Sequence, residues 1–274
     1  MSLFSFESKK GKKLMLVIAL NKVDVMIPNS WDIRLNIPND EAEIQIDKKC
    51  KDIINKLSTE CRLSKDNFIY YSAEKRYNLI KLLSKVVEFS KRGWILSSAN
   101  PRDFTDLIED EQIKEIVMNE RIAMGESLMP TFENSLAQLL ELFKSNLNNE
   151  EFEKIRTKIK EEKSDSPKIV IIGKAGVGKT TTVNALFNAT FKTSSTFIGT
   201  NDAQQKEFAL EHGGNLLITD MPGYGRTEKD DEKYMEIYKR VIPESDIVLL
   251  VIDASQGDYI DDINILNTIK HWIN

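Results

Sequence analysis

The chain has 274 residues and a formal net charge of −5 at pH 7, so its overall charge gives no support to nucleic-acid binding. With 41% hydrophobic and 30% charged residues, it is expected to fold around one large core with room for a smaller helical unit. Its two cysteines have neither the density of a secreted disulfide framework nor metal-ligand spacing. The apolar run at residues 14–20 is too short to cross a bilayer and no signal-peptide cleavage site follows it, so the cytoplasm is the expected compartment.

The N-terminal part of the chain alternates between strand and helix patterns. Residues 14–20, "LMLVIAL", predict a strand that is buried on both faces, and apolar positions over 46–57 share one helical face. A second strand is expected at 67–73, "NFIYYSA". The next segment, 77–93, repeats apolar residues at helical spacing and closes on a glycine, which is a helix stop signal.

The middle of the chain, residues 100–163, contains no strand pattern. Two amphipathic helices are predicted there, over 103–125 and 131–159. The second carries one apolar stripe, which is interpreted as packing surface and consists of Phe132, Leu136, Leu139, Leu140, Phe143 and Leu147. The charged segment 161–167 ends in proline and is interpreted as a linker.

Strands and helices then alternate again to the end of the chain. Strands are expected at 168–173, 206–210, 215–219 and 246–253, and helices from 179, over 234–241 and over 261–273. Alternation of this kind predicts an α/β fold, with a mostly parallel sheet covered by helices on both faces.

The strongest motif is "GKAGVGKT" at residues 173–180, which fits Gly-x-x-x-x-Gly-Lys-Ser/Thr between a predicted strand and a predicted helix. Glycines let backbone N–H groups curl around phosphates, the lysine reaches the β and γ phosphates, and the threonine hydroxyl can ligate magnesium. Nucleotide contacts are expected from Gly173, Ala175, Gly176, Val177, Gly178, Lys179, Thr180 and Thr181, with Lys179 also assigned a catalytic role and Thr180 a metal-binding one.

A second phosphate-side motif follows in "LLITDMPGYG", where Asp220 and Gly223 form Asp-x-x-Gly after an apolar strand. The aspartate can hold the metal and the glycine N–H can contact the γ phosphate. A threonine from the preceding loop is needed to cover the metal and γ phosphate. Thr200 is the preferred candidate for this catalytic and metal-binding role, with Thr196 as its rival.

The first strand is followed by "NKVD", and Asn21, Lys22 and Asp24 supply what a guanine site needs. An ionised aspartate only accepts hydrogen bonds, which suits the guanine N1–H and 2-amino donors. Asn21 can brace the loop, and the stem of Lys22 can lie along the base. After the next strand comes "SAE", so Ser72, Ala73 and Glu74 are expected to read guanine O6 through a backbone N–H.

Taken together, these five elements resemble the G motifs of the Era-like GTPases of the TRAFAC class. Residues 219–254, "TDMPGYGRTEKDDEKYMEIYKRVIPESDIVLLVIDA", are most similar to the bacterial YfjP type. The resemblance covers 14–93 and 168–274 and implies a Mg²⁺-dependent protein that binds GTP and GDP and hydrolyses GTP as a switch.

The order of these motifs is rotated, because the base-reading motifs precede the phosphate-reading ones. We therefore expect a circularly permuted P-loop NTPase, in which 1–93 form the base-reading half of one domain, 94–167 a helical insert or linker, and 168–274 the phosphate-binding half. In an open parallel sheet the site depends on strand positions and not on chain order. The order alone leaves open a domain-swapped dimer, and also whether the permutation is natural, engineered or part of a longer tandem protein.

Departures from the family pattern bear on the mechanism. Tyr224 stands where many such GTPases place a glutamine that orients the attacking water, which implies slow hydrolysis, or hydrolysis completed by a dimer, a partner or another loop residue. Gly176 replaces an asparagine of potassium-stimulated relatives, and Glu74 replaces the usual lysine. The alternative function is a guanine-nucleotide-dependent assembly module with negligible turnover. An ATPase is disfavoured by Asn21 and Asp24, and a ribosome or nucleic-acid partner is not indicated by charge.

Overall fold

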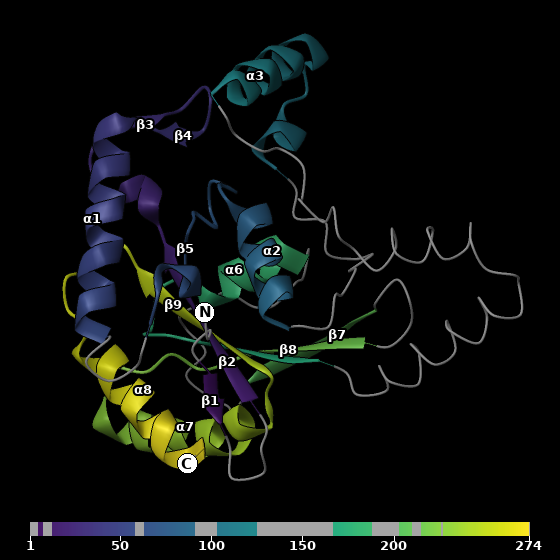
Figure 1. Cartoon of the computed structure of the whole chain (residues 1–274). Coiled ribbons are helices and arrows are strands. Elements are labelled where there is room, and N and C mark those ends of the chain that lie inside the picture. The colour runs from purple at the N-terminus through teal and green to yellow at the C-terminus, as the bar shows by residue number, and fades with distance from the viewer. Residues whose placement is uncertain are drawn as a thin grey trace, which may run out of the picture.

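The computed structural model describes residues 5–7, 13–57, 63–90, 103–124, 167–187, 203–209, 215–225 and 227–273. The predicted helix at 131–159, Thr196 and Thr200 lie outside these ranges. The described strands form a seven-stranded sheet in the order β1-β2-β9-β6-β8-β7, with β5 also paired to β2 (Figure 1). Their bounds are Ser5–Glu7 (β1), Lys13–Asn21 (β2), Phe68–Tyr70 (β5), Lys168–Ile172 (β6), Gln204–Ala209 (β7), Asn215–Asp220 (β8) and Ile247–Asp253 (β9).

The centre of this sheet is parallel, as predicted. Strand β9 pairs in parallel with β2 on one side and with β6 on the other, and β6 pairs in parallel with β8. The antiparallel pairs are β1 with β2 and β7 with β8. In the register of the central pair, Met15 lies opposite Ile247 and Asn21 opposite Asp253, so strands from the two ends of the sequence lie side by side in one sheet.

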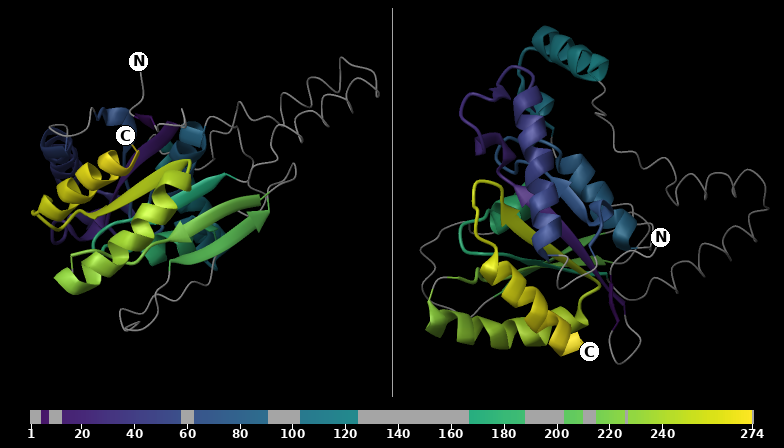
Figure 2. Two further views of the ribbon diagram at one scale, coloured as in Figure 1. Left: turned by 90° about the horizontal axis from the view of Figure 1, so that it is seen from below. Right: turned by 60° about the vertical axis from the view of Figure 1, so that its left-hand side comes forward.

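Helices cover both faces of the sheet (Figures 1 and 2). One face is covered by α1 (Asp40–Leu57), α7 (Glu228–Val241) and α8 (Ile260–Ile273), with α7 and α8 side by side in both figures. The other face is covered by α2 (Leu79–Ser90) and α6 (Lys179–Phe187). The predicted α/β fold class is therefore confirmed, and the buried central strands explain the nearly continuous apolar runs.

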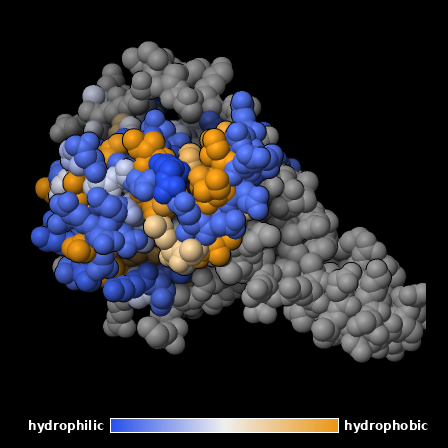
Figure 3. Space-filling model, turned by 90° about the horizontal axis from the view of Figure 1, so that it is seen from above, coloured by the Kyte–Doolittle hydropathy of each residue, from blue (hydrophilic) through white to orange (hydrophobic). Residues whose placement is uncertain are grey.

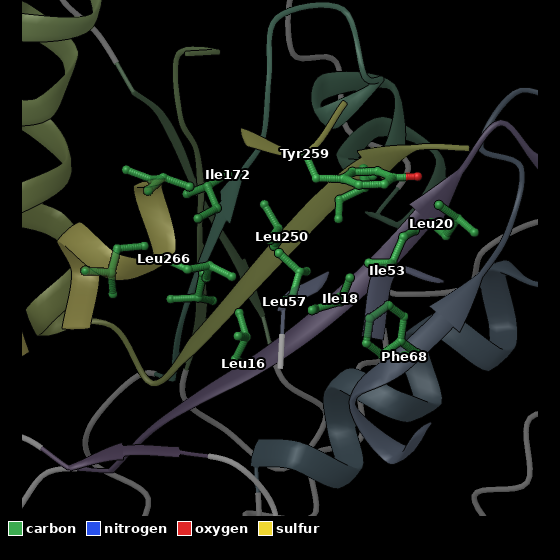
Figure 4. Close-up of a cluster of buried hydrophobic side chains, with 14 of the residues drawn as sticks. Leu16, Ile18, Leu20, Ile53, Leu57, Phe68, Ile172, Leu250, Tyr259 and Leu266 are labelled. Atoms are coloured by element: carbon green, nitrogen blue, oxygen red, sulfur yellow. The ribbon is translucent and has the colours of Figure 1, made fainter. Parts of the chain in front are cut away.

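Alternate side chains of each central strand enter two separate cores. Leu16, Ile18 and Leu20 of β2 pack against Ile53 and Leu57 of α1 (Figure 4). Their neighbours in sequence point to the opposite face, towards α2 and α6, since successive strand residues alternate in direction. Fully burying one leucine or isoleucine side chain contributes about 1.5–3 kcal/mol.

The segment between β2 and α1 contains short strands for which the sequence analysis predicted no element. It contains a two-stranded sheet of β3 (Trp31–Asp32) and β4 (Ile37–Pro38). The turn between them is fixed by Asn36, whose backbone φ is +55° and whose side chain accepts from the indole N–H of Trp31 at 3.1 Å and donates to the carbonyl oxygen of Lys75 at 2.7 Å.

The predicted helix over 103–125 is divided in two. A 3-10 turn, η3 (Phe104–Leu107), precedes α3 (Glu111–Ala123). The break is at Asp110, whose side chain accepts from the backbone N–H groups of Gln112 and Ile113 and so caps a new helix. Helix α3 contacts the turn beyond β3 through an ion pair of 2.6 Å between Arg34 and Glu120.

Further short turns complete the described fold: η1 (Val23–Val25), η2 (Lys65–Asn67) and η4 (Ile242–Glu244).

Seen from the end that carries β3, β4 and α3, the surface shows hydrophobic atoms among hydrophilic ones (Figure 3). Large exposed apolar side chains in or directly next to these elements include Ile33, Ile113, Ile116 and Met124. Within the described ranges, no helix has both the length and the apolarity needed to cross a bilayer.

Candidate functional site

The predicted motif loops meet at the carboxyl ends of β2, β5, β6, β8 and β9, and Asn21 joins two of them. Its side-chain amide donates to the carbonyl oxygen of Val177 at 2.9 Å, and its Oδ1 accepts from the backbone N–H of Ala73 at 3.0 Å. The Asn21 side chain is buried. It therefore ties the glycine-rich loop to the Ser-Ala loop, although 156 positions separate Asn21 from Val177.

The glycine-rich loop has the backbone shape that its glycines permit. Gly176 and Gly178 have φ values of +81° and +95°, in the region that side chains with a Cβ avoid. A Cβ built on Gly178 would also lie 2.3 Å from Nδ2 of Asn21. Both the backbone conformation and the contact with Asn21 therefore require a glycine at position 178. Helix α6 begins directly after this loop, and its first N–H groups and positive dipole end favour a bound anion.

Lys179 is folded back onto the same loop. Its ammonium group donates to the carbonyl oxygens of Gly173 at 2.9 Å and Lys174 at 2.8 Å, and its residue is buried. The neighbouring Thr181 is exposed at the outer side of α6. The loop thus holds a buried cation beside its own backbone, where a phosphate oxygen could replace the carbonyls as acceptor.

Asp220 and Thr180 meet beside this loop. The hydroxyl of Thr180 donates to Oδ2 of Asp220 at 2.5 Å. The other carboxyl oxygen, Oδ1, is buried without a hydrogen-bond partner among the residues that the structure describes. Burial raises the pKa of Asp220, against the opposing effects of the Thr180 hydrogen bond and the nearby Lys179. An orphaned buried carboxylate oxygen next to a hydroxyl fits a hard cation such as Mg²⁺, which prefers oxygen ligands.

Gly223 packs directly over the glycine-rich loop. A Cβ at this position would lie 2.6 Å from Cα and 2.7 Å from the backbone nitrogen of Ala175. The next carbonyl, that of Tyr224, accepts from the Ala175 N–H at 2.9 Å. The Tyr224 side chain turns into the core that contains α7 and α8, where its hydroxyl donates to Oδ1 of Asp262 at 2.5 Å. The Tyr224 side chain is therefore part of the buried core.

The loop after β2 presents Lys22 and Asp24. Lys22 has a φ of +63° and its ammonium group donates to Oδ2 of Asp253 at 2.7 Å and to the carbonyl oxygen of Gly176 at 2.8 Å. Asp24 is half-buried in η1, and within the described part of the chain no hydrogen bond or ion pair engages its carboxylate. It is therefore available as an acceptor for a ligand.

The Ser-Ala loop is held in a tight turn. Ser72 and Tyr77 exchange backbone hydrogen bonds of 3.1 and 3.0 Å, and the Ser72 hydroxyl accepts from the N–H of Lys75 at 3.0 Å. Ser72 and Ala73 are buried, whereas Glu74 is exposed. Within this loop, which was predicted to read guanine O6 through a backbone N–H, the Ala73 N–H donates to Oδ1 of Asn21.

Sequence reasoning missed two residue pairs that hold the site together. Tyr71 and Thr182 are both buried and share a hydrogen bond of 2.6 Å between hydroxyls, which links α6 to the Ser-Ala loop. Asp253 ends β9 and accepts from Lys22. Its position after the apolar run "IVLLVI" was the available signal, because polar residues at the carboxyl ends of parallel strands face the ligand edge.

Hydrogen bonds keep Asp253 ionised. Burial alone would raise its pKa, but the bonds from Lys22 and from the hydroxyl and backbone N–H of Ser255 hold the pKa of Asp253 below its ordinary value. Lys22 therefore faces a full negative charge. The site as a whole combines a glycine-rich loop at a helix N-terminus, a buried carboxylate with an unbonded oxygen among the described residues, and the half-buried Asp24.

The phosphate-side half of the chain is similar to known GTPases. Residues 168–273 match the family model described as 50S ribosome-binding GTPase. GTPase Der of Pseudothermotoga lettingae is 35% identical over 100 residues, which is 35% of this chain and 23% of that protein. GTPase Der of Streptococcus mutans serotype c is 35% identical over 106 residues, 37% of this chain and 24% of that protein.

A third relative, GTPase Der of Karelsulcia muelleri, is 29% identical over 117 residues, 41% of this chain and 27% of that protein. The chain thus spans about a quarter of the length of these curated relatives. The sheet order and the family match over residues 168–273 are consistent with the α/β fold of P-loop GTPases. The loops that carry Asn21 and Ser72 lie outside the matched segment.

Proposed function

We propose that this protein binds GTP with Mg²⁺ and hydrolyses it slowly to GDP and phosphate, as a nucleotide-controlled switch. The observation that carries the proposal is the position of Asn21, which bonds to Val177 in the glycine-rich loop and to Ala73 in the Ser-Ala loop. A base-reading loop and a phosphate-binding loop are thereby held in one site at the carboxyl edge of the sheet, where such a fold binds nucleotides.

The phosphate side supplies charge and backbone donors. Lys179 would exchange the carbonyl oxygens of Gly173 and Lys174 for phosphate oxygens, which form stronger charge-assisted hydrogen bonds. Thr180 and Asp220 would hold Mg²⁺, which supplies neutralisation of the developing phosphate charge when bound. Thr200, or Thr196, remains our proposed third ligand and catalytic residue.

The base side supplies guanine selectivity. Asp24 is an acceptor with no described partner, which suits the two donors of guanine and disfavours adenine. We assign guanine O6 to a backbone N–H of the loop that carries Ser72 and Ala73, which the bond from the Ala73 N–H to Oδ1 of Asn21 holds in place. The stem of Lys22 would lie against the base.

Slow turnover follows from the side chain of Tyr224. Its hydroxyl is bonded to Asp262 inside the core, so position 224 offers no polar group to align the attacking water. The alternative is a guanine-nucleotide-dependent assembly module with negligible turnover. The buried Tyr224 side chain also supports this alternative. A dimer or an activating partner that supplies the missing group would favour the enzyme.

We further propose that the chain is a circularly permuted Era-like GTPase, with 1–93 and 168–274 as two halves of one domain and 94–167 as an insert. The pairing of β2 with β9 supports this proposal, because it places the base-reading loop two strands from the glycine-rich loop despite their reversed order in sequence. The family model that residues 168–273 match is described as 50S ribosome-binding GTPase, and co-sedimentation with 50S subunits tests whether this chain binds them.

Two measurements test the proposed function. Calorimetric titration should show binding of GTP and GDP in Mg²⁺ and no comparable binding of ATP. A single-turnover assay of phosphate release, with and without excess protein to drive dimerisation, separates the two candidate functions. Release that is slow but faster than in the absence of protein supports the GTPase, whereas tight GTP binding without release supports the assembly module. ATP binding equal to GTP binding would contradict both.

A further inference from the structure

The side chain of Lys22 spans from the base-reading loop to the glycine-rich loop. Its ammonium group lies 2.7 Å from Oδ2 of Asp253 and 2.8 Å from the carbonyl oxygen of Gly176. The backbone of Lys22 adopts a left-handed conformation with a φ of +63°, which is uncommon for a residue with a side chain. Two fixed acceptors therefore determine the direction of the Lys22 stem.

Asp253 is itself held rigidly. It is the last residue of β9 and lies opposite Asn21 in the parallel register, and the next N–H, that of Ala254, donates to the carbonyl oxygen of Asn21 at 2.8 Å. Its Oδ1 accepts from the backbone N–H and the hydroxyl of Ser255, at 2.9 and 2.6 Å. This leaves Oδ2 aimed at Lys22, and the carboxylate is almost fully buried whereas the lysine side chain is 37% exposed.

We propose that Asp253 is a positioning residue for guanine-nucleotide binding, which holds the Lys22 ammonium at Gly176 so that the Lys22 stem is fixed where the base binds. This inference rests on the proposed function. The carboxylate acts through Lys22 and has no contact of its own to the nucleotide. Ser255 takes part because it keeps the second oxygen of Asp253 occupied.

The two partners differ in how they can be replaced. An asparagine at 253 can still accept from Ser255, but its amide would turn a donor towards the Lys22 ammonium, so the lysine would leave its place. A methionine at 22 keeps a long unbranched stem and lacks the ammonium group. The contact between stem and base is not sensitive to the guanine 2-amino group, which Asp24 is proposed to read. Loss of the Asp253 carboxylate should therefore lower the affinity for every purine nucleotide that the site accepts by the same factor.

The experiment measures GDP and IDP affinity in Mg²⁺ for the full chain, Asp253→Asn, Lys22→Met and the double variant. We expect each single variant to lose about tenfold in GDP affinity. The double variant should bind GDP no more weakly than the single variant that has the lower affinity. The ratio of GDP to IDP affinity should stay unchanged in Asp253→Asn and fall in Asp24→Asn. Asp47→Asn, which breaks an exposed Asp–Lys pair on α1, is the matched control and should bind GDP like the parent.

The outcomes for the positioning role of Asp253 can be distinguished from the outcomes for the proposed function. Parental GDP affinity in a folded Asp253→Asn variant, or independent losses that multiply in the double variant, would overturn the role of Asp253 while leaving the GTP site intact. Failure of the parent itself to bind GDP would refute the proposed function instead. If Asp253→Asn does not fold, Ser255→Ala serves in its place: it should lose about two- to threefold in GDP affinity in the parent and nothing in the Lys22→Met background. Equal losses in both backgrounds would overturn the role.

Discussion

The hydroxyl of Tyr224 donates a hydrogen bond of 2.5 Å to Oδ1 of Asp262, and both side chains are buried between the sheet and α8. Tyr224 directly follows Gly223, which packs against Ala175 in the glycine-rich loop. The hydrogen bond between Tyr224 and Asp262 therefore anchors the Gly223 loop to α8. This loop is the one proposed to respond to the γ phosphate. A bond of this kind has a cost, because the carboxylate of Asp262 is removed from water.

The first prediction concerns the pH dependence of stability. Burial raises the pKa of Asp262 to about 6, against the opposing effects of the Tyr224 hydrogen bond and Lys174. A raised native pKa means that this group stabilises the fold below its unfolded pKa, near 4, and that this contribution is lost as pH rises through about 6. Asp262→Asn should therefore be more stable than the parent at pH 8, by about 1–3 kcal/mol, and equal to it near pH 4.

Denaturant unfolding at both pH values checks this prediction. Asp66→Asn, at an exposed aspartate of η2, is the control and should change little at either pH. A variant Asp262→Asn that is less stable than the parent at pH 8 would show that the ionised carboxylate is a net stabilising partner of Tyr224.

The second prediction concerns Lys179. Its ammonium group is buried and is held by two loop carbonyls, and no other described cation takes the same place. Lys179→Ala should reduce GTP binding by about 2–4 kcal/mol, since it removes a charge-assisted contact to phosphate. Calorimetric titration measures this, with the exposed Lys48→Ala on α1 as control. Equal affinity in Lys179→Ala and parent would mean that "GKAGVGKT" is not the phosphate site.

The third prediction tests the contact between the two halves of the site. A Cβ at Gly178 would lie 2.3 Å from Nδ2 of Asn21, and the φ of +95° disfavours any side chain there. Gly178→Ala should therefore displace Asn21 and weaken GDP binding at least about tenfold. Gly257→Ala is the matched control, because a Cβ there meets nothing within 4 Å. Normal GDP affinity in folded Gly178→Ala would show that Asn21 does not brace the loop.

Local signals in the sequence predicted most of the fold. The buried strands at 14–20 and 246–253 and the phosphate loop at 173–180 have strong apolar or glycine patterns, and the structure confirms both strands and the turn. Two-residue strands such as β3 and β4 carry no such pattern. They depend on the contacts of Asn36 with Trp31 and Lys75, the second of which is 39 positions away.

The sequence indicated the positions of the motifs of the candidate site, but not most of the contacts that hold their side chains in place. Asn21 was expected to brace a loop, and in the structure its side chain bonds to Val177 and Ala73. The partner of Lys22 could not be predicted, because Asp253 is 231 positions away and its role depends on the register of β2 with β9. The direction of the Tyr224 side chain likewise depends on Asp262 in a distant helix, so the sequence indicated only that a glutamine is absent.

The most direct test of a guanine site built from both ends of the sequence is Asp24→Asn. Guanine offers two donors to the carboxylate, whereas xanthine keeps the N1–H but carries a carbonyl at position 2, which matches an asparagine amide. A site that reads such hydrogen bonds can discriminate by up to about 10⁴-fold. Competition binding of GTP and xanthosine triphosphate in Mg²⁺ should show preference for GTP in the parent and for xanthosine triphosphate in Asp24→Asn. An unchanged preference for GTP in the variant would contradict a guanine site at this loop, since "NKVD" would then be no more than the turn after a strand.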